Sequence, residues 1–445
     1  MKYTPVIGLE VHVELKTLSK MFCGCSADYF GKKPNTHTCP VCLGMPGALP
    51  VPNRKAIEWC VMIGLALNCE IPSFSKFDRK NYFYPDLAKG YQISQYDQPF
   101  CIAGSITLSN GKKIGITRAH MEEDTAKLTH VKIDGENVSL IDFNRSGVPL
   151  VEIVTEPDFE SAEEVMEYLK RLQQIVRHLG VSNADMEEGD MRLEPNISLR
   201  KEGIKELPKY KVEVKNINSF KFVGKAIEYE IKRQAEILEK GDTPKQETRG
   251  WNEAKNVTLS QRSKEEAKDY RYFPEPDIPP IRWSKEEIEQ LRENMPVLAD
   301  KKVERYQTEY DLTKDQAVTI INSEELEKIF EDLIRQRELV KSGEEKPEFK
   351  VLANWIINRK KDIENQTTAQ IFHSIQSHLV LVTISNEEMK KLAQEAIEEN
   401  PKAVSDFKAG KETVIQVLIG AVMRKTAGKA DASKVKGILK ALLTP

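Results

Sequence analysis

The strongest constraint on the fold is a change of pattern at residues 271–280, which hold four prolines in ten residues. Proline fixes φ and removes a backbone donor, so this segment cannot be helical and is predicted to be extended. Before it, short alternating runs are separated by Gly, Pro and Asn clusters, which is typical of mixed α and β structure. After it, the chain is rich in Glu and Lys with helical periodicity. We therefore predict an α+β chain whose N-terminal domain is mixed and whose remainder is helical.

Two long helices are predicted within the mixed part. Residues 161–179 begin with Ser161 and carry Glu164 three residues later, which is the pattern of a capping box, and Gly180 follows as a C-cap. The second helix covers residues 219–240.

Length and charge indicate a further division of the chain. With 445 residues, and about 100–200 residues per domain, two to four domains are expected. The net charge is −3, but residues 401–445 hold nine Lys or Arg and three acids, so this tail carries +6 and the rest −9. A basic tail can contact a phosphate backbone, although a solvated helix face has the same composition. The predicted domains are 1–283, 284–385 and 386–445.

Composition excludes several classes of protein. Hydrophobic residues make up 40% and charged residues 30%, which excludes a disordered chain. No apolar run reaches the ~18 residues that cross a bilayer, and the N-terminus has no signal-peptide pattern. We expect a cytoplasmic protein with no membrane contact. In that reducing compartment the seven cysteines point to a metal or to chance rather than to disulfides.

Residues 6–15 are predicted to form a strand with one apolar and one polar face. Alternation puts Ile7, Leu9, Val11, Val13 and Leu15 on one side, and Gly8, Glu10, His12 and Glu14 on the other. Same-face neighbours lie roughly 6.5–7 Å apart, so the acid–histidine row can share one divalent cation or one charged substrate. A solvent-facing strand would show the same alternation. Further acids, at residues 120–124 and 185–194, and Glu152 inside an apolar run, favour a site.

Four cysteines have metal-site spacing. Cys23 and Cys25 form one close pair, Cys39 and Cys42 another, and 13 residues separate the pairs. Two such pairs can give tetrahedral thiolate ligation of a structural zinc ion. Reduced, buried thiols are the alternative interpretation.

The same region has a second possible interpretation. His12 and Glu14, followed by Cys39-Pro-Val-Cys42, resemble the zinc-deaminase pattern H-x-E…P-C-x-x-C. Thr38 stands where that pattern has proline, and Cys23 and Cys25 offer competing ligands, so a deaminase is disfavoured.

Residues 76–92 alternate cations with aromatic side chains, including Lys80, Tyr82, Tyr84 and Lys89. Rings stack on exposed bases and cations hold phosphates, so this loop suits a single-stranded nucleotide end, although core aromatics are the alternative. The chain has no P-loop, no dinucleotide fingerprint and no G-x-S-x-G elbow. Phosphate chemistry would therefore need carboxylate-held Mg²⁺.

Taken together, these motifs resemble the B-subunit family of the three-subunit tRNA-dependent Asp/Glu amidotransferases. The resemblance runs along the whole chain. The matching stretches are residues 6–15, 20–25, 34–46, 77–95, 114–124, 149–158, 186–200, 270–277 and 420–443.

The resemblance implies a cradle-shaped α/β domain, a helical domain and a small tail domain that grips tRNA. The cradle is expected to use ATP and Mg²⁺ to phosphorylate the side chain of misattached Asp or Glu on tRNA(Asn) or tRNA(Gln). Ammonia, released from glutamine by a separate amidase A subunit, would then form the amide, and a small C subunit would complete the complex. Such a protein is a carbon–nitrogen ligase of protein biosynthesis.

The resemblance also implies site residues. The Mg²⁺ and kinase centre would hold Glu10, His12, Glu123 and Glu152. Glu194 occupies a position that the family usually fills with Asp, so its ligand role stays open. The 3′ end of the tRNA would meet Lys80, Tyr82, Tyr84 and Lys89. The zinc-bearing branch matches Cys23, Cys25, Cys39 and Cys42, and the tRNA body would contact Arg424, Lys425 and Lys429.

Two alternatives remain beside this interpretation. The related large subunit of the archaeal two-subunit enzyme carries an extra domain between cradle and helices, whereas here the proline-rich segment runs directly into the helical region at Ser284. A zinc-containing tRNA-binding module without catalysis is the second alternative.

Overall fold

The computed structural model describes residues 3–263, 270–341, 346–359, 363, 366–380, 386–408, 414–426 and 432–443. The chain forms two compact units, one up to Leu298 and one from Ala299 onward. Each is described by itself. None of the helices within the described ranges is long and apolar enough to cross a membrane.

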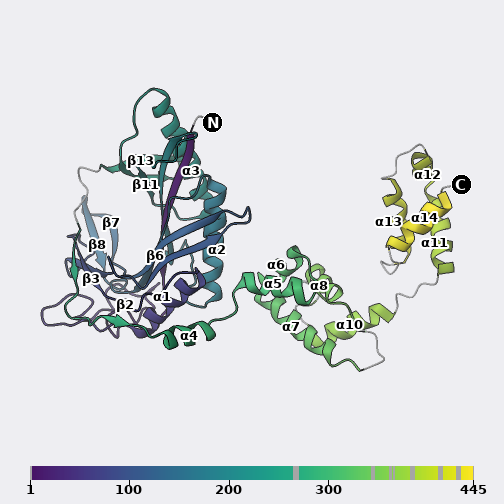
Figure 1. Ribbon diagram of the computed structural model, residues 1–445, viewed down its shortest axis with the longest axis horizontal. Coiled ribbons are helices and arrows are strands. Elements are labelled where there is room, and N and C mark those ends of the chain that lie inside the picture. The colour runs from purple at the N-terminus through teal and green to yellow at the C-terminus, as the bar shows by residue number, and fades with distance from the viewer. Residues whose placement is uncertain are drawn as a thin grey trace. The chain divides into compact units, whose positions relative to one another are not determined.

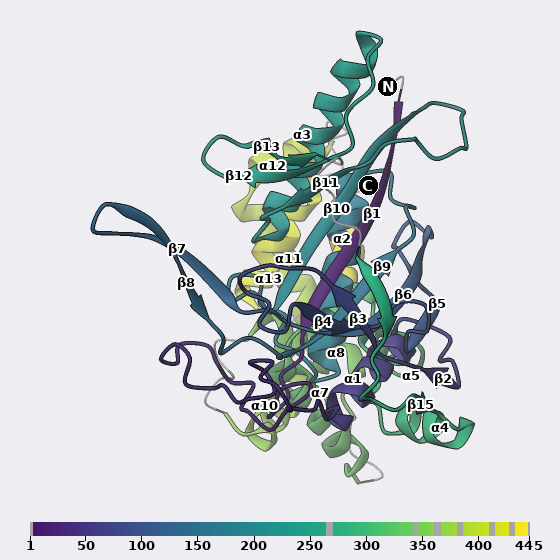
Figure 2. The same ribbon diagram turned by 90° about the vertical axis from the view of Figure 1, so that its left-hand side faces the viewer.

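An eight-stranded sheet forms the centre of the first unit. In spatial order its strands are β13 (Val257–Ser263), β12 (Glu247–Asn252), β11 (Val212–Lys215), β10 (Met191–Lys201), β1 (Tyr3–Glu14), β9 (Pro149–Thr155), β6 (Lys113–Glu123) and β5 (Cys101–Thr107). The first strand of the chain therefore lies in the middle of the sheet, between two antiparallel neighbours (Figure 2). On one side of β1, strands β10 to β13 follow in chain order toward the edge.

Three smaller sheets accompany the large one. They are a three-stranded sheet of β14 (Arg271–Pro274), β3 (Asp78–Asn81) and β4 (Tyr91–Ser94), the pair β15 (Ile281–Arg282) and β2 (Phe74–Ser75), and the hairpin β7 (Lys127–Ile133) and β8 (Glu136–Asp142). The hairpin stands out from the rest of the unit (Figure 2). The proline-rich segment is not helical, as predicted; its first four residues are extended as β14, and a turn follows at residues 276–277.

The core of the first unit lies between the large sheet and its helices. These helices are α1 (Arg54–Ala66), α2 (Ala162–His178), α3 (Phe220–Glu239) and α4 (Lys285–Glu293). In Figure 1, α2 and α3 run beside the long strands. Because the odd-numbered side chains of β1 from Ile7 to Val13 are buried in this core, the predicted alternation of the strand is confirmed.

The two predicted helices are α2 and α3. Ser161 is the N-cap of α2 and accepts a hydrogen bond from the Glu164 amide, as predicted. The return bond of the capping box differs, because the Glu164 carboxylate accepts from the amide of Glu160 rather than of Ser161. Gly180 follows with a φ of +70°, a left-handed conformation that glycine adopts without strain.

The second unit is helical, as the sequence predicts. Its helices are α5 (Ala299–Glu309), α6 (Lys314–Ile321), α7 (Glu324–Glu338), α8 (Phe349–Asn358), α10 (Thr368–Val380), α11 (Asn386–Glu399), α12 (Pro401–Lys408), α13 (Ile415–Lys425) and α14 (Ala432–Leu443). Two separate apolar clusters lie within it, one built from helices α5 to α10 and one from α11 to α14. The expected boundary near residue 385 lies outside the described residues. The boundary at 284 stays a prediction; α4 packs through Ile288 and Leu291 on the first unit's core.

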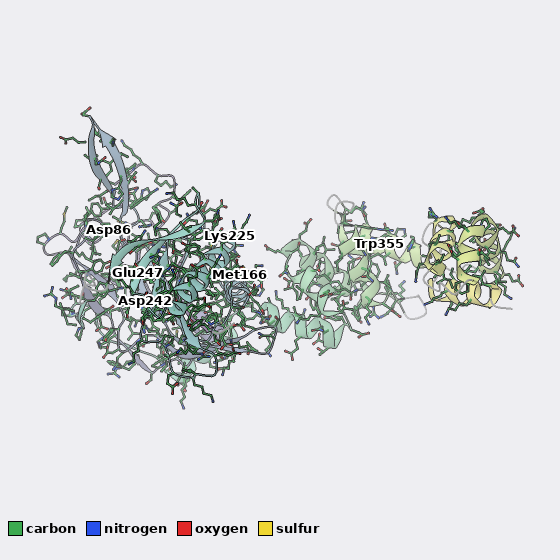
Figure 3. All side chains as sticks on the ribbon, turned by 90° about the horizontal axis from the view of Figure 1, so that it is seen from above. Asp86, Met166, Lys225, Asp242, Glu247 and Trp355 are labelled. Carbon is green, nitrogen blue, oxygen red and sulfur yellow. The ribbon has the colours of Figure 1, made fainter. Side chains whose placement is uncertain are left out.

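A buried ion-pair network joins α3 to the edge of the sheet. Glu230 is fully buried and accepts hydrogen bonds from Arg233 Nε and Nη2, from Gln234 Nε2 and from Thr258 Oγ1 of β13. Arg249 of β12 lies 3.2 Å from the same carboxylate and 2.7 Å from Glu247, which Figure 3 labels.

Removing this carboxylate is expected to destabilise the first unit. Glu230→Ala would leave two guanidinium groups without their buried partner, which costs about 3–5 kcal/mol of unfolding free energy. Urea denaturation followed by tryptophan fluorescence, to which the buried Trp251 of β12 contributes, measures the loss. Glu228→Ala, an exposed position on the same helix, is the control and should change stability by no more than about 0.5 kcal/mol. Equal effects of the two substitutions would contradict the structural role of Glu230.

Candidate active site and metal centres

The polar face of β1 meets polar residues of its neighbouring strands. His12 stands opposite Glu152 of β9 and Arg192 of β10, and Glu10 stands opposite Glu194 of β10. On the next strand outward, His120 of β6 stands opposite Glu152. Residues that pair directly across strands share a face of the sheet. Four strands therefore bring acids and imidazoles together on the face opposite the core.

Four side chains on this face form what we call the acid–histidine cluster, namely His12, His120, Glu122 and Glu152. Glu152 Oε2 lies 3.5 Å from His12 Nε2 and 3.4 Å from His120 Nε2. Glu122 Oε1 lies 3.6 Å from His120 Nε2. One ligand atom each of His12, Glu122 and Glu152 lies within 4.8 Å of the others. Glu152, the acid that interrupts an apolar run of the sequence, thus has two imidazoles as partners.

The charges of this cluster shift its pKa values in opposite directions. Burial and Glu122 raise the pKa of Glu152, but His120 and His12 outweigh them and bring it to about 2. Burial lowers the pKa of His12, yet the hydrogen bond and charge of Glu152 leave it above its usual range. Without a cation, Glu152 is therefore a carboxylate stabilised by imidazolium charge.

Glu122 is buried, and several donors surround its carboxylate. It accepts hydrogen bonds from Ser94 Oγ at 2.7 Å and Gln92 Nε2 at 3.1 Å, and Lys80 Nζ lies 3.5 Å away. Burial raises the pKa of Glu122, but Lys80 and His120 hold it well below its usual range. This carboxylate is therefore ionised and fixed in orientation.

A second group, which we call the carboxylate cluster, contains Glu10, Glu194 and Glu213. Burial, and then the charges of Glu152, Glu194 and Glu213, raise the pKa of Glu10. Burial also raises the pKa of Glu194, but Lys215, which donates to it at 2.8 Å, outweighs burial and lowers the value. The cluster thus concentrates negative charge next to the acid–histidine cluster.

A cavity of about 340 Å³ adjoins the carboxylate cluster. Glu10, Val154 and Asn196 line it from the sheet, and Lys209 and Lys211 line it from the loop before β11. Its volume lies within the range of small-ligand sites, and its lining combines apolar surface with cations. An anionic ligand that binds a metal could occupy it.

Both clusters fit a divalent cation. The carboxylate cluster offers only oxygen donors, which Mg²⁺ prefers, and the acid–histidine cluster adds one imidazole nitrogen. Burial and then the neighbouring carboxylates raise the pKa of Glu10, and a bound cation would offset the repulsion between these carboxylates.

Glu123, which the sequence analysis assigned to the same centre, has other partners. Lys89 Nζ donates to both of its oxygens, at 2.5 and 2.6 Å, and the amide of Ile93 donates at 2.9 Å. The fold brings Glu10, His12, Glu152 and Glu194 together, whereas Glu123 binds Lys89. Its ligand role remains a prediction.

The aromatic and basic loop contributes cations to this centre. Lys80 lies over the ring of Tyr270 at 5.3 Å, and Tyr82 meets the same ring edge-on at 5.6 Å. Tyr84 is 54% exposed. Tyr96 stacks on Tyr272 of β14, and no sequence pattern singled out that pair.

Sequence reasoning missed two acids of the clusters. Glu122 was passed over for its neighbour Glu123, although Glu122 and His120 have the two-residue spacing that places them on one face. Glu213 lies on β11, and only its pairing with Asn196 of β10 brings it to Glu10. Strand parity could have found Glu122, whereas Glu213 required the sheet order.

The four cysteines form a thiol cluster. Their four Sγ atoms all lie within 4.8 Å of one another, and the Sγ atoms of Cys39 and Cys42 are 3.9 Å apart. Two thiolates on one zinc ion, each at ~2.3 Å in tetrahedral geometry, lie ~3.8 Å apart, so the residues present fit zinc. His12 groups with carboxylates and not with these cysteines, which disfavours the deaminase pattern.

The surroundings of Cys42 favour its thiolate form. The hydrogen bond from Cys23 lowers the pKa of Cys42 to about 4. The Lys20 ammonium, whose side chain is fully buried, lies 3.7 Å from its sulfur. Metal binding requires deprotonated sulfur, so the arrangement favours ligation. The remaining cysteines, Cys60, Cys69 and Cys101, are buried in the core.

Two of the expected tRNA contacts lie on α13 in the second unit. Arg424 is exposed. Lys425 donates to Glu395 at 2.9 Å and Glu399 at 2.6 Å, both on α11. Lys429 lies outside the described residues.

Comparison with known proteins decides the family. Residues 5–289 match the family described as the GatB/GatE catalytic domain, and residues 350–443 match the GatB domain. The B subunit of the aspartyl/glutamyl-tRNA(Asn/Gln) amidotransferase of Caldanaerobacter subterraneus is 46% identical, and the match covers 99% of both chains. This chain belongs to the family of amidotransferase B subunits.

Other members of this family show the same similarity. The protein of Caldicellulosiruptor saccharolyticus is 46% identical over 99% of both chains, and that of Thermomicrobium roseum is 43% identical over 100% of this chain and 99% of its own. The chain is therefore one subunit of a tRNA-dependent amidotransferase, a ligase of protein biosynthesis. A tRNA-binding module without catalysis is thereby excluded.

The thiol cluster predicts a metal measurement. We expect the purified chain to retain about one zinc ion, and Cys42→Ser to abolish retention, because a closed structural site needs all four ligands. Elemental analysis after dialysis against a chelator measures the content. Cys69→Ala removes a buried thiol outside the cluster and should keep the zinc. Zinc retained in Cys42→Ser would contradict the assignment.

Proposed function

We propose that this chain uses ATP and Mg²⁺ to phosphorylate the side-chain carboxylate of Asp on tRNA(Asn), of Glu on tRNA(Gln), or of both. Ammonia then replaces the phosphate and gives Asn-tRNA or Gln-tRNA. The observation that carries this proposal is the pair of acidic clusters on one face of the sheet, next to a cavity lined by Lys209 and Lys211. Nucleotide chemistry without a P-loop needs such a carboxylate site.

The proposed reaction balances as two steps. In the first, the bond between the γ-phosphorus and the oxygen of ADP breaks, and a bond forms between that phosphorus and a side-chain carboxylate oxygen. In the second, the nitrogen of ammonia bonds to the activated carbonyl carbon, phosphate leaves, and a proton is released. A carboxylate is otherwise a poor acceptor for ammonia, so activation is the demanding half.

In this scheme the protein mainly positions charge. The acid–histidine cluster and the carboxylate cluster hold the cation, with His12, Glu122, Glu152 and Glu10 as ligand candidates. When bound, Mg²⁺ neutralises charge that develops on the transferring phosphoryl group. Lys211 lines the cavity and acts on the charge of Glu10, so it is suited to the nucleotide's phosphates. The protein supplies little covalent chemistry, which agrees with the absence of a nucleophile motif.

The loop that carries Lys80 and Lys89 is proposed to receive the 3′ end of the tRNA. Lys80 reaches Glu122 of the acid–histidine cluster and Lys89 reaches the neighbouring Glu123, which supports a place for this loop next to the cluster. Tyr82 and Tyr84 offer rings on which unpaired bases can stack.

The remaining parts of the scheme concern partners. Ammonia would come from an amidase A subunit, and a small C subunit would join the two. The tail, with Arg424, Lys425 and Lys429, would grip the tRNA body. We expect the complex in the cytoplasm, where aminoacyl-tRNA is made and used.

The acid–histidine cluster generates the first test. In the assembled complex, Glu152→Gln is expected to lower ATP-dependent amidation by more than ~100-fold, because the variant keeps the shape and loses the charge that would bind the cation. Formation of Asn-tRNA and Gln-tRNA is measured with ammonium chloride as the nitrogen donor, which removes the need for glutamine. Glu123→Gln is expected to give the same loss.

Glutaminase activity of the partner is the control for assembly and should survive both substitutions. Glu156→Gln, just beyond the end of β9 and hydrogen-bonded to Thr117, is a matched acid outside the clusters and should keep full amidation. Full amidation by Glu152→Gln would overturn the site.

The tail generates the second test. Arg424→Ala is expected to raise the KM for aminoacyl-tRNA and to lower the salt dependence of tRNA binding by about one unit of slope, because an exposed cation releases counterions when it meets a phosphate. The kcat at saturating tRNA should not change.

Lys425→Ala is the matched comparison on the same helix. Its ammonium is already balanced by Glu395 and Glu399, so a smaller effect on tRNA binding is expected. An unchanged salt slope in Arg424→Ala would contradict a phosphate contact there.

A further inference from the structure

Arg118 lies on β6 beside the proposed phosphorylation centre, and a β-bulge determines where it points. The pairing of β6 with β9 shifts between Ile116 and Arg118, so that Thr117 is an extra residue. Ile116 is buried in the core, as are Ala119 and Met121 further along the strand. The extra residue changes the alternation, and Arg118 therefore shares the opposite face with His120 and Glu122.

Arg118 differs from the cations that surround the acid–histidine cluster, each of which is paired with an acid in the described part of the chain. The paired cations are Lys80 with Glu122, Lys89 with Glu123, Arg192 with Asp124, and Lys215 with Glu194. The Arg118 side chain makes no hydrogen bond or ion pair with any residue that the structure describes, and its Nε is buried without an acceptor. An unsatisfied buried donor costs stability, so a bound acceptor is the simplest explanation of its retention.

The surroundings of Arg118 indicate the kind of acceptor. Across the sheet it stands opposite Val154, and Val154 stands opposite Glu10. With strands ~4.8 Å apart, the backbones of Arg118 and Glu10 are separated by ~10 Å across a small apolar residue that also lines the cavity. An anion above Val154 would lie between a guanidinium on one side and cation-binding carboxylates on the other.

A second observation brings the Arg118 side chain to the same point. Burial raises the pKa of Tyr272 on β14 to about 12, and the charges of Lys80, Glu122, Glu152 and Arg118 act on the same phenol. The guanidinium and both acids of the acid–histidine cluster are therefore within electrostatic range of the same phenol. Arg118 is only partly exposed to solvent.

We propose that Arg118 binds the phosphoryl group during its transfer from the nucleotide to the side-chain carboxylate of the aminoacyl-tRNA. The inference rests on the proposed function and adds a residue that touches the reacting atoms. The phosphorus–oxygen bond to ADP breaks and the bond to the carboxylate oxygen forms, with no proton transferred. The planar N–H fork of Arg118 donates to the equatorial phosphoryl oxygens, which carry the charge in the transition state.

The test uses the assembled complex with saturating aminoacyl-tRNA and ATP, and measures single-turnover formation of ADP. Arg118→Met is expected to lower this rate by ~100-fold or more while the KM for aminoacyl-tRNA changes little, because the contact is strongest in the transition state. Arg118→Lys keeps the charge but not the fork and should recover only part of the rate. Added guanidinium chloride should rescue Arg118→Met and not wild type, which a merely structural role would not predict.

Controls distinguish the outcomes. Arg54→Ala, an exposed arginine on α1 whose partner is Glu58, should keep the full rate. If Arg118→Met instead raises the KM for aminoacyl-tRNA at constant kcat, Arg118 binds the substrate carboxylate and the proposal is wrong. A full rate in Arg118→Met while Glu152→Gln is inactive also overturns it and leaves the proposed function intact. Full activity in both variants would overturn the site itself.

Discussion

The first unit depends on holding several carboxylates close together on one face of a sheet. Burial raises the pKa of Glu10, and the like charges around it raise the pKa further. The fold offsets the repulsion locally: imidazoles stand next to Glu152, and Lys215 stands next to Glu194. Such a surface gains most from a divalent cation, because the cation replaces repulsion with attraction. The rest of the unit, from the central position of β1 to the loop that brings Lys80 and Lys89, supports this concentration of charge.

The parts of the fold governed by local pattern could be predicted from the sequence. The alternation of β1, the helices α2 and α3, the Ser161 N-cap of α2 and the extended start of the proline-rich segment all follow from side-chain periodicity and backbone chemistry. Of the two hydrogen bonds of the predicted capping box, only the one accepted by Ser161 is present. The Glu164 carboxylate accepts from the amide of Glu160 instead of the amide of Ser161. A side chain long enough to reach two amides is not fixed by spacing alone.

The candidate site required information that no local pattern contains. Glu10, His12 and Glu152 could be selected because each acid or imidazole interrupts an apolar alternation. Glu213 could not, because its approach to Glu10 depends on the strand order β11, β10, β1. The choice between Glu122 and Glu123 depended on parity within one strand, and the partner of each acid, Ser94 and Gln92 or Lys89, comes from a loop and strand some thirty residues earlier.

The bulge at Thr117 has a consequence for how β6 can vary in evolution. Before the bulge, the even-numbered Ile114 and Ile116 face the core. After it, the odd-numbered Ala119 and Met121 face the core, so the alternation of the strand shifts by one residue. Loss of the single extra residue would exchange inside and outside for one half of the strand, placing an arginine in the core or acids against helices. A substitution on one face of β6 leaves the orientation of the other side chains unchanged. An insertion or deletion at Thr117 would instead reverse the orientation of half of the strand. Both the polar face of the site and the packing of the core therefore depend on the presence of Thr117. Its own side chain takes part in neither, because it donates a hydrogen bond to Glu156 at the surface.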